Sequence, residues 1–413
     1  MKSICHLSTR DGGGGAALAT YRLHRGIQQH GWKSTMLVAK GPCEDTTVQR
    51  VHPQRKSLIR RVISRIPGCR RKPDPTKTFN VTQTTSFEFC SLPKSPYTNL
   101  SEYIDPDVDL VQLNWVADLL DWQSFFKQVR WPLVWRLADM NPFTGVCHYS
   151  VDCRRFATGC SQCPQLLDPG SGKAAESLRI KHEALAQIPD DQMTVVTQSQ
   201  WMRELVSESV LRRFKQVTIS NGVDKSVYRP LDRMQMRQKL GIETTKPIAM
   251  LCGLGKSDRG GVNRLLKEIE HRLGDSIYLL LVGRSTIAKP TFTDSTVTAS
   301  IPQDQLPMWY SAADVLLFPS LQDNCPNVVL ESQACGLPVL AFDGSGTSEL
   351  IREGVNGWLA PCGDFAEFCT RLETLLSTGD LARVRQRPDE ICRSARDYSE
   401  MLSDYLALYD TLV

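Results

Sequence analysis

Residues 320–342 constrain the fold more than any other part of the chain. An apolar run at 315–319 precedes this segment, and a second apolar run, 337–342, closes it. Between the two runs, Pro326 suits the first turn of a helix and Gly336 suits its end. Strand, loop, helix and strand in this order predict the βαβ unit of a parallel sheet, in which ligands bind beside the carboxyl ends of the strands.

Two acids stand eight positions apart in this unit. Asp323 lies in the loop and Glu331 lies in the expected helix, with Asn324 and Asn327 between them. A helix N-terminus offers N–H groups to an anion, and the two carboxylates can accept hydrogen bonds from hydroxyl groups. A phosphate beside several hydroxyls describes a nucleotide sugar. The alternative is that one acid caps the helix and the other is a solvated helical residue.

The whole chain alternates short apolar runs with helical stretches. Its 413 residues suggest two domains, each with its own core. We expect an N-terminal domain over 1–228, a C-terminal domain over 229–393, and an amphipathic helix over 394–413 that packs back across the joint. The expected strands lie at 4–8, 35–39, 110–113, 133–137, 194–197, 217–219, 248–252, 278–282, 297–301, 315–319 and 339–342, and the clearest helices at 15–31 and 262–272.

Composition excludes several classes of protein. A net charge of +4 on this length does not indicate a nucleic-acid-binding protein. The chain has no run of eighteen apolar residues and no signal-peptide core, so we expect a cytoplasmic location. Most of the fourteen cysteines stand singly among apolar neighbours, which fits a reducing compartment.

A glycine-rich loop follows the first expected strand. Residues 12–15 are all glycine, and a helix is predicted to start directly after them, so Gly14 and Gly15 can bring bare backbone N–H groups against a phosphate. The loop also fits a variant of the dinucleotide fingerprint, which would indicate an NAD(P)-dependent oxidoreductase. The second strand ends at Lys40 without the acid that an NAD site needs. A tight turn without a ligand is the third alternative.

Several segments together resemble the retaining family 4 glycosyltransferases of the Glu-x7-Glu type. They are the glycine-rich loop, Asn221-Gly222-Val223-Asp224, Val282-Gly283-Arg284, Ala312-Ala313-Asp314-Val315, Asp323 to Glu331 and Gly336-Leu337-Pro338-Val339. The resemblance implies an α/β chain with the GT-B fold, in which two Rossmann-like domains face a cleft and a C-terminal helix crosses back. It implies transfer of a sugar from a nucleoside diphosphate sugar to a glycan or lipid-linked acceptor, in polysaccharide or glycoconjugate biosynthesis. No metal or other cofactor is expected.

The same resemblance assigns residues to the donor. Glu331 would hold the donor ribose, and Asp323 with the Asn324 and Cys325 amides would hold the donor sugar. Cations are needed because negative charge develops on the leaving diphosphate. The expected donor-binding residues are Gly14, Gly15, Lys256, Arg259, Arg284, Asp323, Asn324, Cys325, Asn327 and Glu331.

The segment 135–149 resembles a subgroup that carries a histidine before an aspartate. This chain has Ala138 in the place of that histidine, followed by Asp139. We therefore expect Asp139 to orient or deprotonate the attacking hydroxyl, together with Asp323 and Glu331 as catalytic residues. Asp139 as a helix cap is the alternative. Loss of the histidine also leaves open a nucleotide-sugar or glycan-binding relative with weakened catalysis.

One group of cysteines departs from the scattered pattern. Cys147, His148, Cys153, Cys160 and Cys163 fall in one short segment, and the last two have the spacing of a zinc knuckle. The other spacings are irregular. The segment therefore indicates either a structural zinc site or buried thiols that shape an acceptor loop, and we favour the thiols.

A basic segment at residues 55–72 holds eight Lys and Arg residues and no acid. Its apolar residues recur at helical spacing, which is typical of an amphipathic helix that lies on anionic lipid. Each basic residue near such a surface contributes about 1 kcal/mol. The segment therefore predicts peripheral membrane contact, and a solvated helix is the alternative.

Overall fold

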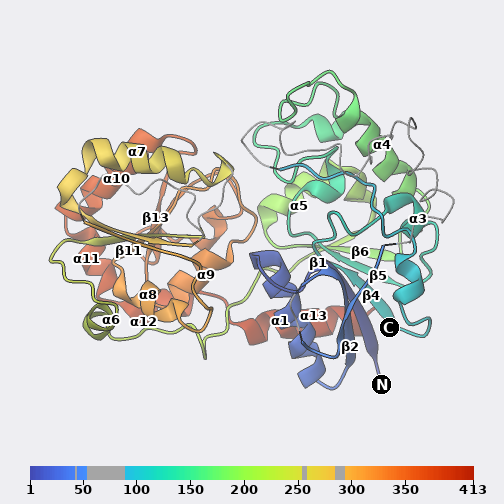
Figure 1. Cartoon of the computed structure of the whole chain (residues 1–413), viewed down its shortest axis with the longest axis horizontal. Coiled ribbons are helices and arrows are strands. Elements are labelled where there is room, and N and C mark those ends of the chain that lie inside the picture. Colours follow the sequence, from blue (N-terminus) through green and yellow to red (C-terminus); the bar gives the residue numbers. More distant parts are fainter. Residues whose placement is uncertain (42–43, 54–88, 254–257, 284–293) are drawn as a thin grey trace, which may run out of the picture. The chain divides into compact units, whose positions relative to one another are not determined.

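The computed structural model describes residues 1–41, 44–53, 89–253, 258–283 and 294–413 (Figure 1). The chain divides into two compact units. The first unit contains Met1–Thr197, Met202–Thr218 and Tyr405–Val413, and the second contains Gln198–Trp201 and Ile219–Asp404. The basic segment 55–72, Lys256 and Arg284 lie outside the described residues, so what the sequence predicts for them stays a prediction.

The first unit is built on a parallel sheet of seven strands in the order β3-β2-β1-β4-β5-β6-β7. The chain runs outward from β1 to one edge and then returns to fill the other side, so the order reverses between β1 and β4. Buried apolar residues dominate the central strands. The strands are β1 Ser3–Arg10, β2 Lys33–Lys40, β3 Val48–Arg50, β4 Leu110–Leu113, β5 Leu133–Arg136, β6 Met193–Thr197 and β7 Lys215–Thr218.

Helices pack on both faces of this sheet. On one face, His24 of α1 contacts His6 of β1, with ring centroids 5.9 Å apart. On the other, Trp122 of α3 packs on Trp135 of β5 at 5.2 Å. The described helices are α1 Gly15–Gln29, α3 Trp122–Phe126, α4 Lys173–Leu185 and α5 Gln200–Ser207, with short 3-10 turns at Leu100–Tyr103, Asn141–Phe143, Arg155–Ala157 and Val210–Arg213.

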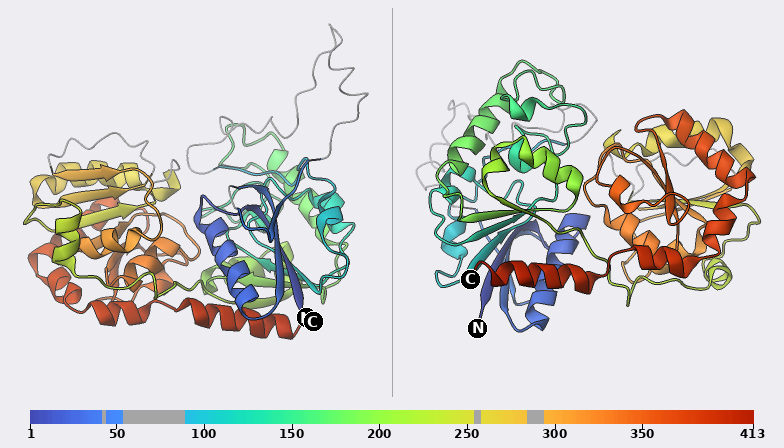
Figure 2. Two further views of the ribbon diagram at one scale, coloured as in Figure 1. Left: turned by 60° about the horizontal axis from the view of Figure 1, so that its bottom comes forward. Right: turned by 180° about the vertical axis from the view of Figure 1, so that it is seen from behind.

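The C-terminal helix α13, Tyr398–Asp410, begins in the second unit, and its last residues belong to the first. Within the first unit, the Tyr409 hydroxyl donates to Gln112 on β4, and the Tyr409 ring lies 5.8 Å from that of Trp32. Lys2 pairs with Asp410 at 2.6 Å. The two chain ends therefore lie close together (Figure 2).

The second unit is built on a parallel sheet of six strands in the order β10-β9-β8-β11-β12-β13. As in the first unit, the strand order reverses beside the first strand of the sheet, here between β8 and β11. The strands are β8 Ile248–Cys252, β9 Tyr278–Val282, β10 Ser295–Thr298, β11 Val315–Phe318, β12 Val339–Phe342 and β13 Gly357–Ala360. The helices are α6 Arg233–Lys239, α7 Val262–Arg272, α8 Leu306–Ala312, α9 Asn327–Ala334, α10 Phe365–Ser377, α11 Asp380–Arg385 and α12 Pro388–Ser394, with 3-10 turns at Asp258–Gly260, Gly274–Ser276 and Ser348–Leu350.

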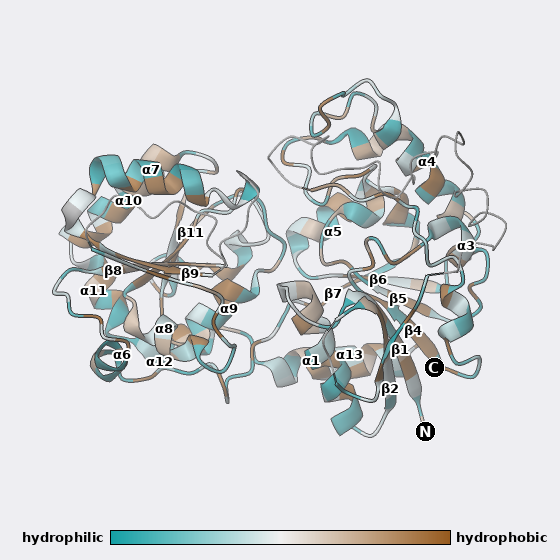
Figure 3. Ribbon diagram, viewed as in Figure 1, coloured by the Kyte–Doolittle hydropathy of each residue, from teal (hydrophilic) through white to brown (hydrophobic). Residues whose placement is uncertain are grey.

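Alternate residues of β8 enter two separate hydrophobic cores, one on each face of the sheet. Leu251 packs with α7 and α10 residues such as Leu265. Met250 packs with α8 and α9 residues such as Leu330. Figure 3 shows these central strands coloured as hydrophobic between helices of mixed hydropathy. Two parallel sheets with helices on both faces confirm the predicted pair of Rossmann-like domains.

Several predicted boundaries differ from the structure by a few residues, and two of these differences have a clear cause. The strand expected at 297–301 lies at Ser295–Thr298, because its partner β9 ends at Val282, which pairs with Thr298. Helix α9 begins at Asn327, and Pro326 takes the N-cap position instead of the first turn. Within the described residues, no helix combines the length and apolarity that crossing a membrane requires.

Candidate functional site

Asn324 is buried in the second unit, and its side chain makes hydrogen bonds that hold the loop between β11 and α9. Ser199 Oγ donates to Asn324 Oδ1 at 2.6 Å, and Asn324 Nδ2 donates to Gln198 Oε1 at 3.2 Å. Gly346 lies so close that a Cβ atom at that position would come within 1.8 Å of the Asn324 carbonyl oxygen. The loop conformation is therefore fixed by hydrogen bonds and by one glycine that has no room for a side chain.

Asn221 holds the start of α9 in the same way. Its Nδ2 donates to the Cys325 carbonyl oxygen and to Asn327 Oδ1, both at 3.0 Å. Gln198 Nε2 donates to Asn221 Oδ1 at 3.1 Å. The side chains of Asn324 and Asn327 thus take part in an internal network that sets the position of the backbone at the start of the helix.

Arg259 and Asp323 are brought together by the fold, although 64 positions separate them. Arg259 Nη1 lies 3.3 Å from Asp323 Oδ2, and it also donates to the Gln322 carbonyl oxygen at 2.5 Å. Asp323 Oδ1 accepts the Asn324 N–H at 2.9 Å. Both side chains keep partial exposure, 19% for Arg259 and 24% for Asp323, so a ligand can reach them.

Glu331 lies on α9 and is only 5% exposed. The Tyr310 hydroxyl of α8 lies 3.3 Å from Glu331 Oε2 and 3.6 Å from Cys252 Sγ, at the end of β8. Burial raises the pKa of Cys252 to about 11 and that of Tyr310 well above its ordinary value, so both groups are neutral near pH 7. Through Tyr310, the Glu331 carboxylate lies near Cys252 at the carboxyl end of β8. The strand order of the sheet reverses at this point, between β8 and β11.

Gly14 and Gly15 stand at the N-terminus of α1, at the carboxyl end of β1 in the first unit. Gly14 is the N-cap residue, with extended backbone and no side-chain cap. A Cβ atom on Gly12 or Gly14 would meet nothing within 4 Å. The loop therefore presents open backbone, as an anion site at a long helix requires.

Asp139 follows β5 in the first unit and is 7% exposed. Its Oδ2 accepts from Trp115 Nε1 at 2.7 Å and from His148 Nδ1 at 2.6 Å, and its Oδ1 accepts the Asn141 N–H at 2.9 Å. Burial by itself would raise the pKa of Asp139, but His148 and the other donors outweigh it and the net pKa is lowered. The carboxylate is therefore ionised near pH 7 and is a weak base.

His148 is the second link of a buried chain. Its Nε2 lies 2.9 Å from Ser91 Oγ, so both ring nitrogens have partners. Neither Ser91 nor His148 lines the hollow that Asp139 reaches. Ser91 and His148 therefore hold Asp139 in place, and neither of them presents a nucleophile to the hollow.

The hollow beside Asp139 contains about 340 Å³ of empty space, part of it open to solvent. Ala138 forms part of its wall, where the resembling subgroup has a histidine. Trp135 also lines it, and the buried Trp135 indole N–H has no hydrogen-bond partner in the described part of the chain. The wall is formed by Leu92, Asn114, Trp115, Val116, Ala117, Trp122, Trp135, Ala138, Asp139, Asn141 and Pro142.

Three partners of these residues were not predicted from the sequence. Tyr310 beside Glu331, Trp115 beside Asp139, and Ser199 beside Asn324 lie at least 21 positions from the groups that they contact. No local motif marks them. Only Asn221 carried a signal in the sequence, because Asn221-Gly222-Val223-Asp224 is one of the segments that resemble the family.

Comparison with known proteins matches the family described as Glycosyl transferases group 1 to residues 246–378, within the second unit. A D-inositol 3-phosphate glycosyltransferase from Nocardia farcinica is 29% identical over 201 residues, which are 45% of this chain and 44% of that protein. The sulfoquinovosyl transferase of Arabidopsis thaliana is 29% identical over 194 residues, 44% of this chain and 36% of that protein. The matches span less than half the length of these two relatives.

Solved structures cover the chain more fully. The sucrose-phosphate synthase from Thermosynechococcus elongatus superposes with a TM-score of 0.70 at 16% identity, covering 100% of this chain and 99% of that one. HepE from Anabaena, solved in complex with UDP and glucose, gives a TM-score of 0.66 at 15% identity and covers 100% of both chains. These likenesses confirm the predicted GT-B fold.

Proposed function

We propose that this chain, which has the GT-B fold and whose residues 246–378 match the group 1 glycosyl transferases, is a glycosyltransferase. It moves a sugar from a nucleoside diphosphate sugar to a hydroxyl of a glycan or lipid-linked acceptor. The observation that carries the proposal is the buried Glu331 carboxylate at the end of β8, beside the reversal in strand order. Parallel sheets bind nucleotides at that point, and a buried acid there suits ribose hydroxyls.

Three groups in the second unit then receive the donor. Glu331 accepts hydrogen bonds from the ribose. Arg259 neutralises the diphosphate, and Asp323 turns from Arg259 to accept hydroxyls of the transferred sugar. The side chains of Asn324 and Asn327 position the loop through internal hydrogen bonds. The donor is then bound by backbone N–H groups of this loop, including that of Cys325. A TM-score of 0.65 to the HepE complex with UDP-glucose, at 16% identity, supports a nucleotide sugar as the ligand class.

The first unit supplies the acceptor site in this proposal. The ionised Asp139 lines one hollow with Trp135, whose N–H has no partner among the described residues, so an acceptor hydroxyl can donate to the acid and accept from the indole. Gly14 and Gly15 offer backbone N–H groups to a phosphate. Because the pKa of Asp139 is lowered, orienting the hydroxyl suits it better than taking its proton. Transfer retains the anomeric configuration and needs no catalytic metal.

A panel of UDP-, GDP-, ADP- and CDP-sugars tests the proposal. One donor is expected to raise the melting temperature, and the same donor is expected to give an anomerically retained product with an acceptor, read by NMR. Stabilisation without turnover would favour the binding-only relative. An inverted product would contradict retention. Flotation with anionic and neutral vesicles tests the membrane contact proposed for residues 55–72, which would be peripheral on the cytoplasmic side.

A further inference from the structure

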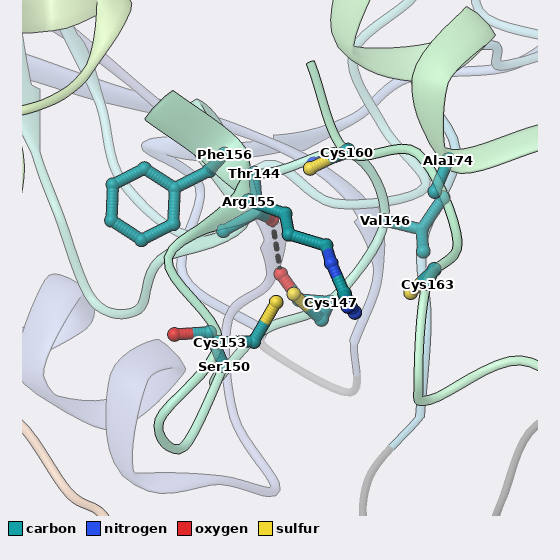
Figure 4. Close-up of a pocket in the computed structure, with 11 residues that line it drawn as sticks. Thr144, Val146, Cys147, Ser150, Cys153, Arg155, Phe156, Cys160, Cys163 and Ala174 are labelled. Carbon is teal, nitrogen blue, oxygen red and sulfur yellow. Dashed lines mark hydrogen bonds between the residues drawn. The ribbon is translucent and has the colours of Figure 1, made fainter. Parts of the chain in front are cut away.

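Four cysteines of the first unit gather around one pocket. Cys147, Cys153, Cys160 and Cys163 all line a space of about 280 Å³ (Figure 4). All four are free thiols. Their spacing in the sequence is irregular, so the fold of the loop is what brings them to the same place.

His148 does not belong to this group. Its Nδ1 lies 2.6 Å from Asp139 and its Nε2 lies 2.9 Å from Ser91, so neither nitrogen is available to a metal ion. The five candidate ligands of the sequence therefore reduce to four cysteines. Four cysteines are a common ligand set of structural Zn²⁺ sites, which are closed and tetrahedral.

The backbone around Cys160 has two features that a metal-bound thiolate would explain. The Gly145 N–H donates to Cys160 Sγ at 3.3 Å. Cys160 and Gln162, the first and third residues of the Cys-x-x-Cys turn, have φ angles of 56° and 54°, in the left-handed region. Such angles in non-glycine residues cost about 1–3 kcal/mol each when nothing compensates for them. Bonds from two thiolates of this turn to one ion would offset that cost.

Positive charge stands beside the pocket. Lys181 is fully buried, and its Nζ donates to the carbonyl oxygens of Asn141 and Thr144, at 2.5 and 3.0 Å. The described residues contain no ion pair to Lys181. Thr144 itself lines the pocket, and Arg155 forms another part of the wall. One Zn²⁺ with four thiolates carries a net charge of −2, which these two cations would balance.

We propose that Cys147, Cys153, Cys160 and Cys163 bind one structural Zn²⁺ as thiolates. Four Zn–S bonds form, and the four S–H protons pass to solvent. As the side chains stand, no group of three or more His, Cys, Asp or Glu residues in the described part of the chain could hold a metal ion. The four thiols must therefore turn inward to reach Zn–S distances of about 2.3 Å. The ion closes the loop that carries His148, and His148 in turn holds Asp139.

Metal analysis of the full chain, expressed in zinc-supplemented medium, tests this directly. About one zinc per chain is expected for the wild type, and almost none for the double variant Cys160→Ser, Cys163→Ser. The matched control, Cys335→Ser with Cys369→Ser, changes two buried cysteines of the second unit and should keep the zinc. Zinc that stays in the first double variant, or is absent from the wild type, would overturn the proposal.

X-ray absorption at the zinc edge keeps the test independent of how the variants fold. The wild type is expected to show four sulfur neighbours at about 2.3 Å. Nitrogen or oxygen neighbours would refute the assignment. A non-reduced wild-type mass lower by two or four hydrogens would also refute it, because the thiols would then be paired as disulfides. None of these readouts needs transferase activity, so the outcome is separate from that of the proposed function.

Discussion

Replacing Glu331 by Gln changes the proposed ribose contact while almost preserving side-chain volume. The acid is 5% exposed, and its Oε2 lies 3.3 Å from the Tyr310 hydroxyl. A carboxylate offers acceptor sites on both oxygens, whereas the Gln amide offers them on one and presents two donors on the other side. One of two hydrogen bonds from the ribose is therefore lost, and the remaining one is made to a neutral group.

A hydrogen bond to a charged acceptor contributes about 1.5–3 kcal/mol. We therefore expect the Kd of Glu331→Gln for the cognate nucleoside diphosphate to rise about tenfold to hundredfold. The melting temperature without ligand should stay near that of the wild type, because Gln can still accept from Tyr310. Isothermal titration calorimetry measures the first quantity and differential scanning calorimetry the second.

Glu349→Gln is the matched control for this experiment. Glu349 also belongs to the second unit, where its carboxylate accepts the backbone N–H groups of Gln200 and Trp201 at 2.9 and 2.7 Å. We expect its substitution to leave nucleotide affinity unchanged. If Glu331→Gln binds the nucleoside diphosphate within twofold of the wild type, the ribose role of this acid is refuted.

Three further changes test the geometry. In Arg259→Gln, the Kd for a nucleoside diphosphate should rise about tenfold or more while that for the nucleoside stays constant; equal losses for both would contradict a diphosphate contact. Gly346→Ala should lower the melting temperature by at least about 2 °C, because its Cβ would meet the Asn324 carbonyl oxygen at 1.8 Å, whereas Gly12→Ala, with nothing within 4 Å, should not. Asp139 has a folded pKa below the unfolded value of 3.8, so its charge stabilises the fold above that pH and the gain is lost as pH falls through the folded pKa. Urea unfolding should show the stability difference between wild type and Asp139→Asn shrinking below pH 4; a difference that stays constant down to pH 2 would refute this.

Much of the fold could be predicted because its signals are local. The apolar runs at Leu110–Leu113, Ile248–Cys252 and Tyr278–Val282 are the strands β4, β8 and β9, residue for residue. Helix α7 occupies Val262–Arg272, as its periodicity predicts. The half-exposed edge strand β10 was predicted two residues late at its start, because pairing with β9 and not its own hydropathy sets its bounds.

The candidate site could be predicted only in part. The sequence identified Asp323, Glu331 and Asp139 from their positions after strands and from family resemblance, and their roles remain proposals. It could not show that Arg259 and Asp323 pair, that Tyr310 meets Glu331, or that His148 serves Asp139 instead of a metal. Each of these contacts joins different elements, and no periodicity along the chain records it.

The sequence by itself determined the alternation of strands and helices, and therefore two parallel sheets with ligand sites at their carboxyl ends. That alternation follows from hydrophobic period and helix-end residues, which act over a few positions. The tertiary structure decided which polar groups meet at those ends and which cysteines share a pocket. Strand order brings distant segments together, and the burial that results determines which side chains are charged, which are paired, and which remain for a ligand.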